Sequence, residues 1–379
     1  MKTLLFQYTE MGWTIHPTST LADKNNAQLV LCFGAKAILQ NENIFSIIKE
    51  QFPASQISIC STAGEICQEA VQENSLVVVA LQFDKTKIET ASVNIKDFAN
   101  SYLAATNLAE RLPHDDLAYI MVFSDGAVVN GSELVKGLTV ATGKKILVTG
   151  GLAGDDANFK DTLVGLNEQP AAGNIVAIGF YGKNINVTHG SQGGWDIFGL
   201  EKRVTKSSGN VLHEIEGQNA LELYKKYLGT EAENLPGSAL LFPLSVIIPE
   251  THKPVVRTIL SIDEDNKTMT FAGDVPEGSK VRFMKADFDK IITAASTAAG
   301  QTLLDQNTKP DFALLISCVG RKLILGPRTK EELLAVKDTF GDKTMLAGFY
   351  SYGEISPFDD ETDCQLHNQT MTITTFSES

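Results

Sequence analysis

Three predicted β-strands of this sequence end in a glycine followed by an acidic residue. These turns are Gly64-Glu65, Gly154-Asp155 and Gly353-Glu354. Glycine permits backbone conformations that other residues avoid and lets a ligand approach the chain closely, while a carboxylate can orient a bound amine. Two interpretations are open. The turns are either recurring sharp bends whose acids cap neighbouring amides, or they converge on one cleft.

A second group of chemically capable side chains lies in the last third of the chain. Arg321 follows the strand-end segment Cys318-Val319-Gly320, where its guanidinium can bind a carboxylate through two parallel hydrogen bonds. Glu354 follows the next strand end and can bind an amine. The residues that would add hydroxyl groups and aromatic walls there are Tyr350, Ser351 and Tyr352. The alternative is an Arg321–Glu354 salt bridge that fixes two loops without a ligand.

The sequence carries no strong catalytic signature. The segment 126–131 has the glycine spacing of a phosphate-binding P-loop, but Ser132-Glu133 stands where lysine and serine or threonine are required. No GxSxG, HExxH or CxxCH motif occurs, and the five cysteines and six histidines are scattered. The enzymatic hypothesis that remains is a hydrolase or transferase with Cys318 as nucleophile and His367 as base.

Length and composition limit the class of protein. A chain of 379 residues predicts two or three domains. Its 32 Lys and Arg against 46 Asp and Glu give a net charge of −14, which disfavours nucleic acid and anionic membranes as partners because phosphate groups require clustered cations. The longest strongly apolar run, Leu76–Leu81, has the length of a strand and not of a membrane span. With no recognisable secretion signal, we predict a cytoplasmic protein.

An internal repeat defines the predicted fold. Residues 97–125 and 287–318 both begin with Asp-Phe, continue with apolar residues at helical spacing, and reach a proline before an apolar strand. A second helix and a strand ending in a glycine–acid turn follow each copy, and a shorter copy lies around residues 28–66. We predict an α/β fold with two pseudo-symmetric halves of mixed β-sheets flanked by helices and containing β-α-β repeats.

Local signals place a hairpin and the border between the halves. Leu76–Phe83 and Ile88–Ile95 flank a polar turn, which predicts that these two strands pair. A helix that starts after Glu216-Gly217 marks a new unit. The predicted domains are therefore 27–217 and 218–376.

The ordered set of strand-end motifs resembles FIST-domain proteins over about residues 27–376. The matching segments are Ser61–Ile66 and Thr149–Asp155 in the N-terminal half, and Ser317–Arg321, Gly348–Pro357 and His367–Thr372 in the C-terminal half. The resemblance implies an intracellular sensory module that binds a small ligand, amino acids being among the proposals. It also implies output through a separate partner such as a histidine kinase, a chemoreceptor or a cyclic-di-nucleotide enzyme. Because some relatives are haem-binding nitric oxide sensors, haem is the alternative ligand.

We expect the ligand to bind at the strand ends that carry these motifs. The expected contacts are Arg321, Glu354, Tyr350, Ser351, Tyr352, Gly320, Cys318, Glu65, Asp155 and Asn368. The predicted function is thus a cytoplasmic small-ligand sensor, with the haem sensor and the Cys318 enzyme as alternatives.

Overall fold

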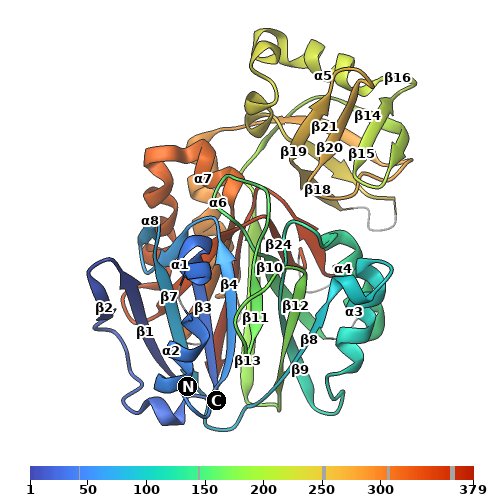
Figure 1. Ribbon diagram of the computed structural model, residues 1–379. Helices are drawn as coiled ribbons and strands as arrows, with labels where there is room; N and C mark the ends of the chain where they lie inside the picture. Colours follow the sequence, from blue (N-terminus) through green and yellow to red (C-terminus); the bar gives the residue numbers. More distant parts are fainter. Residues whose placement is uncertain (42, 144–145, 250–252, 305–307, 359–362) are drawn as a thin grey trace.

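The computed structural model describes residues 1–379 except 42, 144–145, 250–252, 305–307 and 359–362. The strands of the described residues form three six-stranded sheets in one body, and an eight-stranded sheet that projects from it (Figure 1). Helices flank the mixed sheets, so the predicted α/β class is confirmed. We call the fourth sheet the inserted sheet, because its residues, 196–285, leave and re-enter the body.

Each sheet of the body combines strands from distant parts of the chain, named in the order in which they lie side by side. Sheet 1 contains β11 (Val164–Leu166), β4 (Gln56–Thr62), β3 (Leu29–Ala35), β7 (Leu76–Gln82), β1 (Lys2–Thr9) and β2 (Gly12–Ile15). Sheet 2 contains β25 (Gln365–His367), β24 (Gly353–Ser356), β10 (Leu147–Leu152), β9 (Leu117–Ser124), β12 (Asn174–Tyr181) and β8 (Lys87–Asn94). Sheet 3 contains β13 (Ile185–Gln192), β26 (Met371–Glu378), β22 (Phe312–Cys318), β23 (Met345–Ser351), β5 (Glu65–Cys67) and β6 (Ala70–Gln72).

The inserted sheet and the helices complete the described elements. The inserted sheet contains β18 (Pro254–Arg257), β17 (Leu244–Ile247), β21 (Lys280–Lys285), β14 (Asp196–Ser208), β15 (Val211–Ile215), β20 (Thr268–Phe271) and β19 (Ile259–Asp263), with β16 (Gln218–Asn219) beside β15. The α-helices are α1 (Lys36–Asn41), α2 (Ile44–Gln51), α3 (Ser101–Glu110), α4 (Gly131–Ala141), α5 (Ala220–Leu228), α6 (Phe288–Gln301), α7 (Val319–Leu325) and α8 (Thr329–Phe340). The short 3₁₀ helices are η1 (Lys24–Asn26), η2 (Ile95–Asp97), η3 (Gly229–Asn234), η4 (Gly237–Leu241) and η5 (Gly326–Arg328).

The three sheets of the body repeat one plan. Each has a central parallel pair, β3–β4, β9–β10 or β22–β23, next to an antiparallel strand. The second strands of these pairs end at Thr62, Leu152 and Ser351. Three residues beyond those ends stand the acids of the three glycine–acid turns, Glu65, Asp155 and Glu354, at equivalent positions. The predicted internal repeat is therefore present three times.

The strands that come after the three parallel pairs exchange partners around the body. β5 leaves sheet 1 to pair with β23, β11 leaves sheet 2 to pair with β4, and β24 leaves sheet 3 to pair with β10. The exchange closes a ring in which every repeat completes a neighbouring sheet. A similar crossing makes the predicted hairpin wrong: β7 pairs with β1 and β3, whereas β8 joins sheet 2. A polar turn indicates only that the chain changes direction. The two strands do not pair, because their apolar residues pack in two different sheets.

The centre of the body lies between the three sheets. One phenylalanine from each sheet meets there, Phe33, Phe123 and Phe349, with ring centroids 5.0 to 6.0 Å apart. On the outer faces, helices with small buried residues cover the sheets. In α6, for example, Asp287 caps the helix start and Ala294, Ala295, Ala298 and Ala299 are buried. Apolar burial on both faces explains why the strands read as continuous hydrophobic runs.

The inserted sheet contains strands from both sides of the predicted border at 217/218. β14 and β15 precede it and pair with β21 and β20, which follow it. The junction helix α5 packs on this same sheet and contributes Leu221 and Tyr224 to its core. Two connections join the sheet to the body, residues 193–195 after β13 and residues 286–287 before α6.

Candidate functional site

A cleft with two connected chambers lies between the body and the inserted sheet. One chamber holds about 320 Å³ and the other about 410 Å³, within the usual range of small-molecule sites. We name them the Asp274 chamber and the Asn368 chamber after a polar residue in each. They meet at four residues that line both, Phe159, Leu260, Ala272 and Tyr352.

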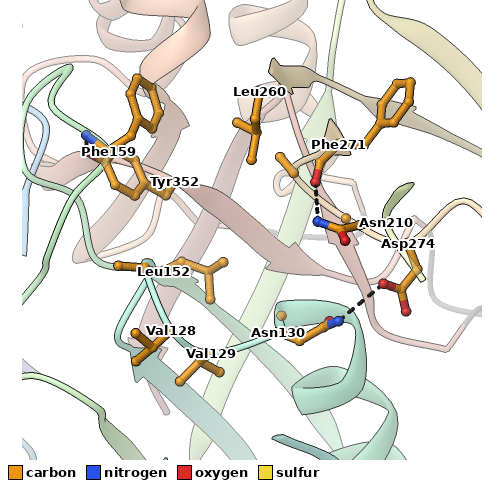
Figure 2. Close-up of a pocket in the computed structure, with 15 residues that line it drawn as sticks. Val128, Val129, Asn130, Leu152, Phe159, Asn210, Leu260, Phe271, Asp274 and Tyr352 are labelled. Carbon is orange, nitrogen blue, oxygen red and sulfur yellow. Dashed lines mark hydrogen bonds between the residues drawn. The ribbon is translucent and has the colours of Figure 1, made fainter. Parts of the chain in front are cut away.

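The Asp274 chamber is bordered by the glycine-bearing loop 126–131 of the body and by β20 of the inserted sheet (Figure 2). Asp274 accepts a hydrogen bond from the Asn130 amide at 3.2 Å, and its backbone N–H donates to Ser132 Oγ at 3.3 Å. On the inserted-sheet side of the chamber, the Asn210 side-chain amide donates to the Phe271 carbonyl at 2.8 Å. Since Asn130 also caps α4, one side chain ties the helix start to the inserted sheet.

The Asn368 chamber is mostly apolar, and two of its lining residues, Asn368 and Thr258, each carry a buried polar atom that has no partner among the described residues. Asn368 is fully buried, and its Oδ1 accepts no hydrogen bond from the described residues. The Thr258 hydroxyl, on a residue 5% exposed, likewise has no partner among them. Leaving such a group unsatisfied costs about 1–3 kcal/mol, so a buried orphan in a cavity indicates a place for a bound molecule.

An aromatic pair stands where the two chambers meet. The rings of Phe159 and Tyr352 stack with centroids 4.6 Å apart (Figure 2). The Tyr352 hydroxyl donates to Asp155 and accepts the Phe159 backbone N–H, so a body strand end holds the loop that carries Phe159. Lys36 lies 3.7 Å from the same Asp155 carboxylate. Asp155 therefore holds the stacked pair of Phe159 and Tyr352 in position through the Tyr352 hydroxyl.

Arg321 is fully buried beside the connections to the inserted sheet and does not reach the cleft. Its Nε and Nη2 donate to Glu332 at 3.1 and 2.9 Å, its Nη1 to the Gly193 carbonyl at 2.7 Å, and its Nη2 also to the Ile291 carbonyl at 2.8 Å. Gly193 belongs to the first connection, and Ile291 follows the second. Arg321 thus joins the first connection to α6, and the alternative of a salt bridge with Glu354 is wrong because Glu332 is the partner.

Glu332 completes this buried group, which we call the Arg321 cluster. Ser317 and Tyr350 donate to its Oε1 at 3.3 and 2.9 Å. The sequence spacing of Thr329 and Glu332 is that of a capping box, but α8 has no side-chain cap. Pairing with a buried guanidinium outweighs capping an exposed amide, since the charge would otherwise be uncompensated.

Glu65 and Glu354 are buried and make equivalent hydrogen bonds. Glu354 accepts from Ser351 at 2.7 Å and from the Thr370 backbone and hydroxyl at 3.1 and 2.8 Å, while Glu65 accepts from Thr62 and Ser75 in the same pattern. Burial raises the pKa of each carboxyl to about 7, against these hydrogen bonds, which lower it. These acids fasten strand ends and do not line either chamber.

The Cys318 and His367 environments do not resemble a nucleophile and its base. Burial raises the pKa of the Cys318 thiol well above its usual range, although Cys318 lines the Asn368 chamber. His367 is buried, its Nε2 donates to the Ser356 carbonyl at 2.8 Å, and burial lowers its pKa to about 4. A reactive cysteine needs a stabilised thiolate, and this site favours the neutral thiol.

Four of the ten expected contact residues line the cleft: Cys318, Gly320, Tyr352 and Asn368. The other six, Arg321, Glu354, Tyr350, Ser351, Glu65 and Asp155, are buried in hydrogen bonds within the protein. Residues that follow β22 and β23 line one chamber, but the acids of the three glycine–acid turns do not. A Cβ at Gly320 would lie 2.7 Å from the Gln369 amide, so glycine there permits close packing of the chamber wall.

Sequence reasoning missed the inserted-sheet side of the cleft. Its main lining residues are Leu240, Thr258, Ile259, Leu260 and Phe271. Nothing in the local sequence shows that this sheet packs on the body. The loop 126–131 did give a signal, because it has the glycine spacing of a P-loop, and it lines the Asp274 chamber.

The described side chains of the cleft do not suit a haem that is ligated by histidine or methionine. The described lining residues of the two chambers include no histidine or methionine as an axial ligand, so they do not fit a histidine-ligated haem. Among the described residues, no group of three or more His, Cys, Asp or Glu side chains could hold a metal ion. In the same part of the chain, no helix combines the length and apolarity needed to cross a bilayer.

Comparison with known proteins identifies the class. Residues 28–218 match the FIST N domain and residues 220–357 match the FIST C domain, so the chain belongs to the FIST family. FIST domains are small-ligand sensory domains of signalling proteins. An uncharacterised protein of Methanocaldococcus jannaschii is 22% identical over 319 residues, which are 76% of this chain and 59% of that protein. The chain thus spans less than two thirds of the relative's length.

Two solved structures have distantly similar folds. A cyanuric acid hydrolase from A. caulinodans aligns with 7% identity and a TM-score of 0.39, covering 100% of this chain and 99% of its own. A second cyanuric acid hydrolase aligns with 8% identity and a TM-score of 0.34 over the same shares of the two chains. Values this low do not bear on the chemistry of this chain.

Proposed function

We propose that this protein is a cytoplasmic small-ligand sensor whose ligand binds in the cleft between the body and the inserted sheet. The observation that carries the proposal is the Asn368 chamber, an apolar cavity of about 410 Å³ lined by two residues that each carry a buried polar atom with no partner among the described residues. Small-molecule sites combine a mostly apolar lining with a few polar groups that fix orientation. A sensory role of this kind is the one shared by FIST domains.

Ligand binding would be detected through the connections to the inserted sheet. The ligand would contact Leu260 on one side and Gly320 on the other, so it favours one relative position of the two parts. Gly320 immediately precedes Arg321, which donates to the Gly193 carbonyl in the first connection. Trp195 in that connection donates to the Gln369 carbonyl at 2.9 Å, next to Asn368. The body wall of the chamber is therefore linked directly to the first connection.

The signal would pass to a separate protein that distinguishes the two positions. A histidine kinase, a chemoreceptor or a cyclic-di-nucleotide enzyme is the kind of partner proposed. Such a partner needs only a population shift, which a ligand produces to the extent that it binds one position more tightly.

The test is a thermal-shift screen of small metabolites on the whole chain, followed by two matched variants. A ligand at about a hundred times its dissociation constant stabilises the protein by about 2.7 kcal/mol. Leu260→Arg places a charge where the chambers meet and should abolish the shift. Leu200→Arg is the control, because Leu200 is 80% exposed on β14 and lines neither chamber. A ligand whose shift survives Leu260→Arg would place the binding site elsewhere.

A further inference from the structure

We infer that the ligand is an uncharged molecule that donates an N–H or O–H hydrogen bond to Asn368 from an apolar or aromatic body. The inference rests on the proposed function, since it specifies what the Asn368 chamber accepts. It departs from the amino-acid ligand implied by the family resemblance. An amino acid needs a cation for its carboxylate, and Arg321, the expected partner, is engaged in the Arg321 cluster.

The orientation of the Asn368 amide determines what it can bind. Its Nδ2 donates to the His367 carbonyl at 3.0 Å. A carbonyl oxygen only accepts, so the nitrogen must occupy that end of the amide and Oδ1 the other. Oδ1 is buried and has no donor among the described residues. A matching ligand group must therefore be a donor.

Thr258 supplies a second and more permissive contact from the inserted side. Its hydroxyl is buried, has no partner among the described residues, and can either donate or accept. Asn368 belongs to the body and Thr258 to the segment between β18 and β19. One ligand that satisfies both atoms would bridge the two parts of the molecule, which is what the proposed sensor requires.

The side chains that line the Asn368 chamber disfavour a charged ligand. Its described residues include no Lys, Arg, His, Asp or Glu. A charge moved from water into such surroundings without a partner carries a large desolvation cost. The apolar walls come from residues such as Leu240, Ile259, Val319 and Tyr352, which suit a flat hydrocarbon or aromatic ring.

Three probes of nearly the same shape separate the effect of a hydrogen-bond donor from the effect of a charge. Benzamide is neutral and donates N–H, acetophenone is neutral without a donor, and benzoate is an anion. Binding to the full chain is measured by methyl NMR of Leu240, Ile259 and Val319, which report the Asn368 chamber. Benzamide should bind at about millimolar concentration, with acetophenone about tenfold weaker and benzoate weaker still.

Asn368→Leu is the decisive variant because leucine has nearly the shape of asparagine and no acceptor. Benzamide affinity should fall about tenfold to that of acetophenone, whose own affinity stays unchanged. Retained acetophenone binding shows that the chamber is intact. If Asn368→Leu does not fold, Thr258→Val provides the same comparison from the opposite wall, with a loss confined to benzamide.

The outcomes distinguish the inference from the proposed function. If benzoate binds in the chamber as tightly as benzamide, or if Asn368→Leu weakens acetophenone equally, the ligand class is wrong while the cleft stays a binding site. If none of the three probes shifts the chamber methyls, the inference fails. The proposed function fails with it only when every ligand found by thermal shift is also insensitive to Leu260→Arg.

Discussion

Arg321, in α7 just after β22, and Asn368, between β25 and β26, are fully buried polar residues with opposite hydrogen-bonding states. The Arg321 guanidinium donates to Glu332, to Gly193 and to Ile291, all inside the protein. The Asn368 Oδ1 has no donor among the described residues. The first is a cation whose partners are supplied by the fold, and the second is a buried neutral acceptor on a residue that lines a cavity.

The contrast shows that residue type alone does not separate structure from function in this protein. Arginine beside a strand-end glycine has the chemistry to bind a ligand carboxylate, yet the fold uses it to hold the first connection of the inserted sheet to α6. The less reactive asparagine is the one whose side-chain oxygen has no donor among the described residues. A charge is costly to bury without a partner, so a fold that buries one supplies that partner itself.

Breaking the Arg321 cluster should have the largest effect on the unfolding free energy. Arg321→Leu leaves Glu332 as a buried charge without its cation, and Glu332→Gln leaves Arg321 in the same position. We expect each variant to lose about 3–5 kcal/mol of unfolding free energy, measured by urea denaturation. The two losses should not add in the double variant, since both break one interaction.

A small loss of stability in Arg321→Leu would contradict the contrast drawn between Arg321 and Asn368. If Arg321→Leu unfolds with nearly the wild-type midpoint but loses binding of the ligand found by thermal shift, Arg321 belongs to the site and the static cluster is misleading. Equal destabilisation by both single variants, with unchanged ligand-induced stabilisation, assigns the cluster to the scaffold.

The pH dependence of stability should be the next largest effect. Burial raises the pKa of Glu354 from its ordinary value of 4.5 to about 7, so the folded state holds a proton that the unfolded state has lost. Stability from this group is present below about pH 4.5 and is lost as the pH rises through 7. The difference is about 3 kcal/mol, at about 1.4 kcal/mol for each pKa unit.

Glu354→Gln removes this titration while keeping an amide of similar shape. Urea denaturation at pH 5 and pH 8 should show the variant gaining stability relative to wild type at the higher pH. Glu65→Gln should behave alike, because Glu65 occupies the equivalent position with a pKa also raised to about 7. A stability difference that stays constant with pH would show that these carboxyls are ionised throughout and held by their hydrogen bonds.

Asn368→Leu should have a smaller effect of opposite sign to that of Arg321→Leu. Removing a buried unsatisfied acceptor relieves its desolvation cost, and the loss of the bond to the His367 carbonyl offsets part of the gain. We expect the unliganded protein to gain up to about 1 kcal/mol, as binding sites often trade stability for function. A loss of more than about 2 kcal/mol in thermal or urea denaturation would mean that Oδ1 has a partner, such as ordered water, in the unliganded protein.

The sequence predicted the repeating part of the fold well. Apolar strands, helices with caps and the recurring glycine–acid turns are local patterns, and each copy of the repeat supplies them within a few tens of residues. The acids Glu65, Asp155 and Glu354 occupy equivalent positions for that reason. The convergence of Gly320 and Tyr352 on one chamber also follows from the parallel pairing of β22 and β23.

The parts of the fold and of the cleft that the sequence did not predict depend on contacts between distant segments. The pairing of β7 with β1 instead of β8, and the partner exchange of β5, are settled by which apolar faces meet. The partner of Arg321 could not be chosen from sequence, since Glu332 and Glu354 are both acids on nearby elements. The cleft forms because Thr258 and Leu260 of the inserted part lie opposite residues of the body, and no local pattern encodes that packing.

The smallest effect should come from an ion pair with the same chemistry as the Arg321 cluster but on the surface. Arg328 donates to Glu331 at 2.8 Å and to Asp289 at 2.7 Å, and its side chain is 39% exposed. Water and salt screen these charges, so Arg328→Gln should lower the urea midpoint only slightly. Because the Debye length falls to about 3 Å in 1 M salt, urea denaturation with added salt should erase even this difference. The same salt should leave the loss in Arg321→Leu nearly intact, since buried pairs are poorly screened. If the two arginine variants lost similar stability with similar salt dependence, burial would not be what distinguishes the two sites, and the contrast between a closed cluster and an open chamber would lose its physical basis.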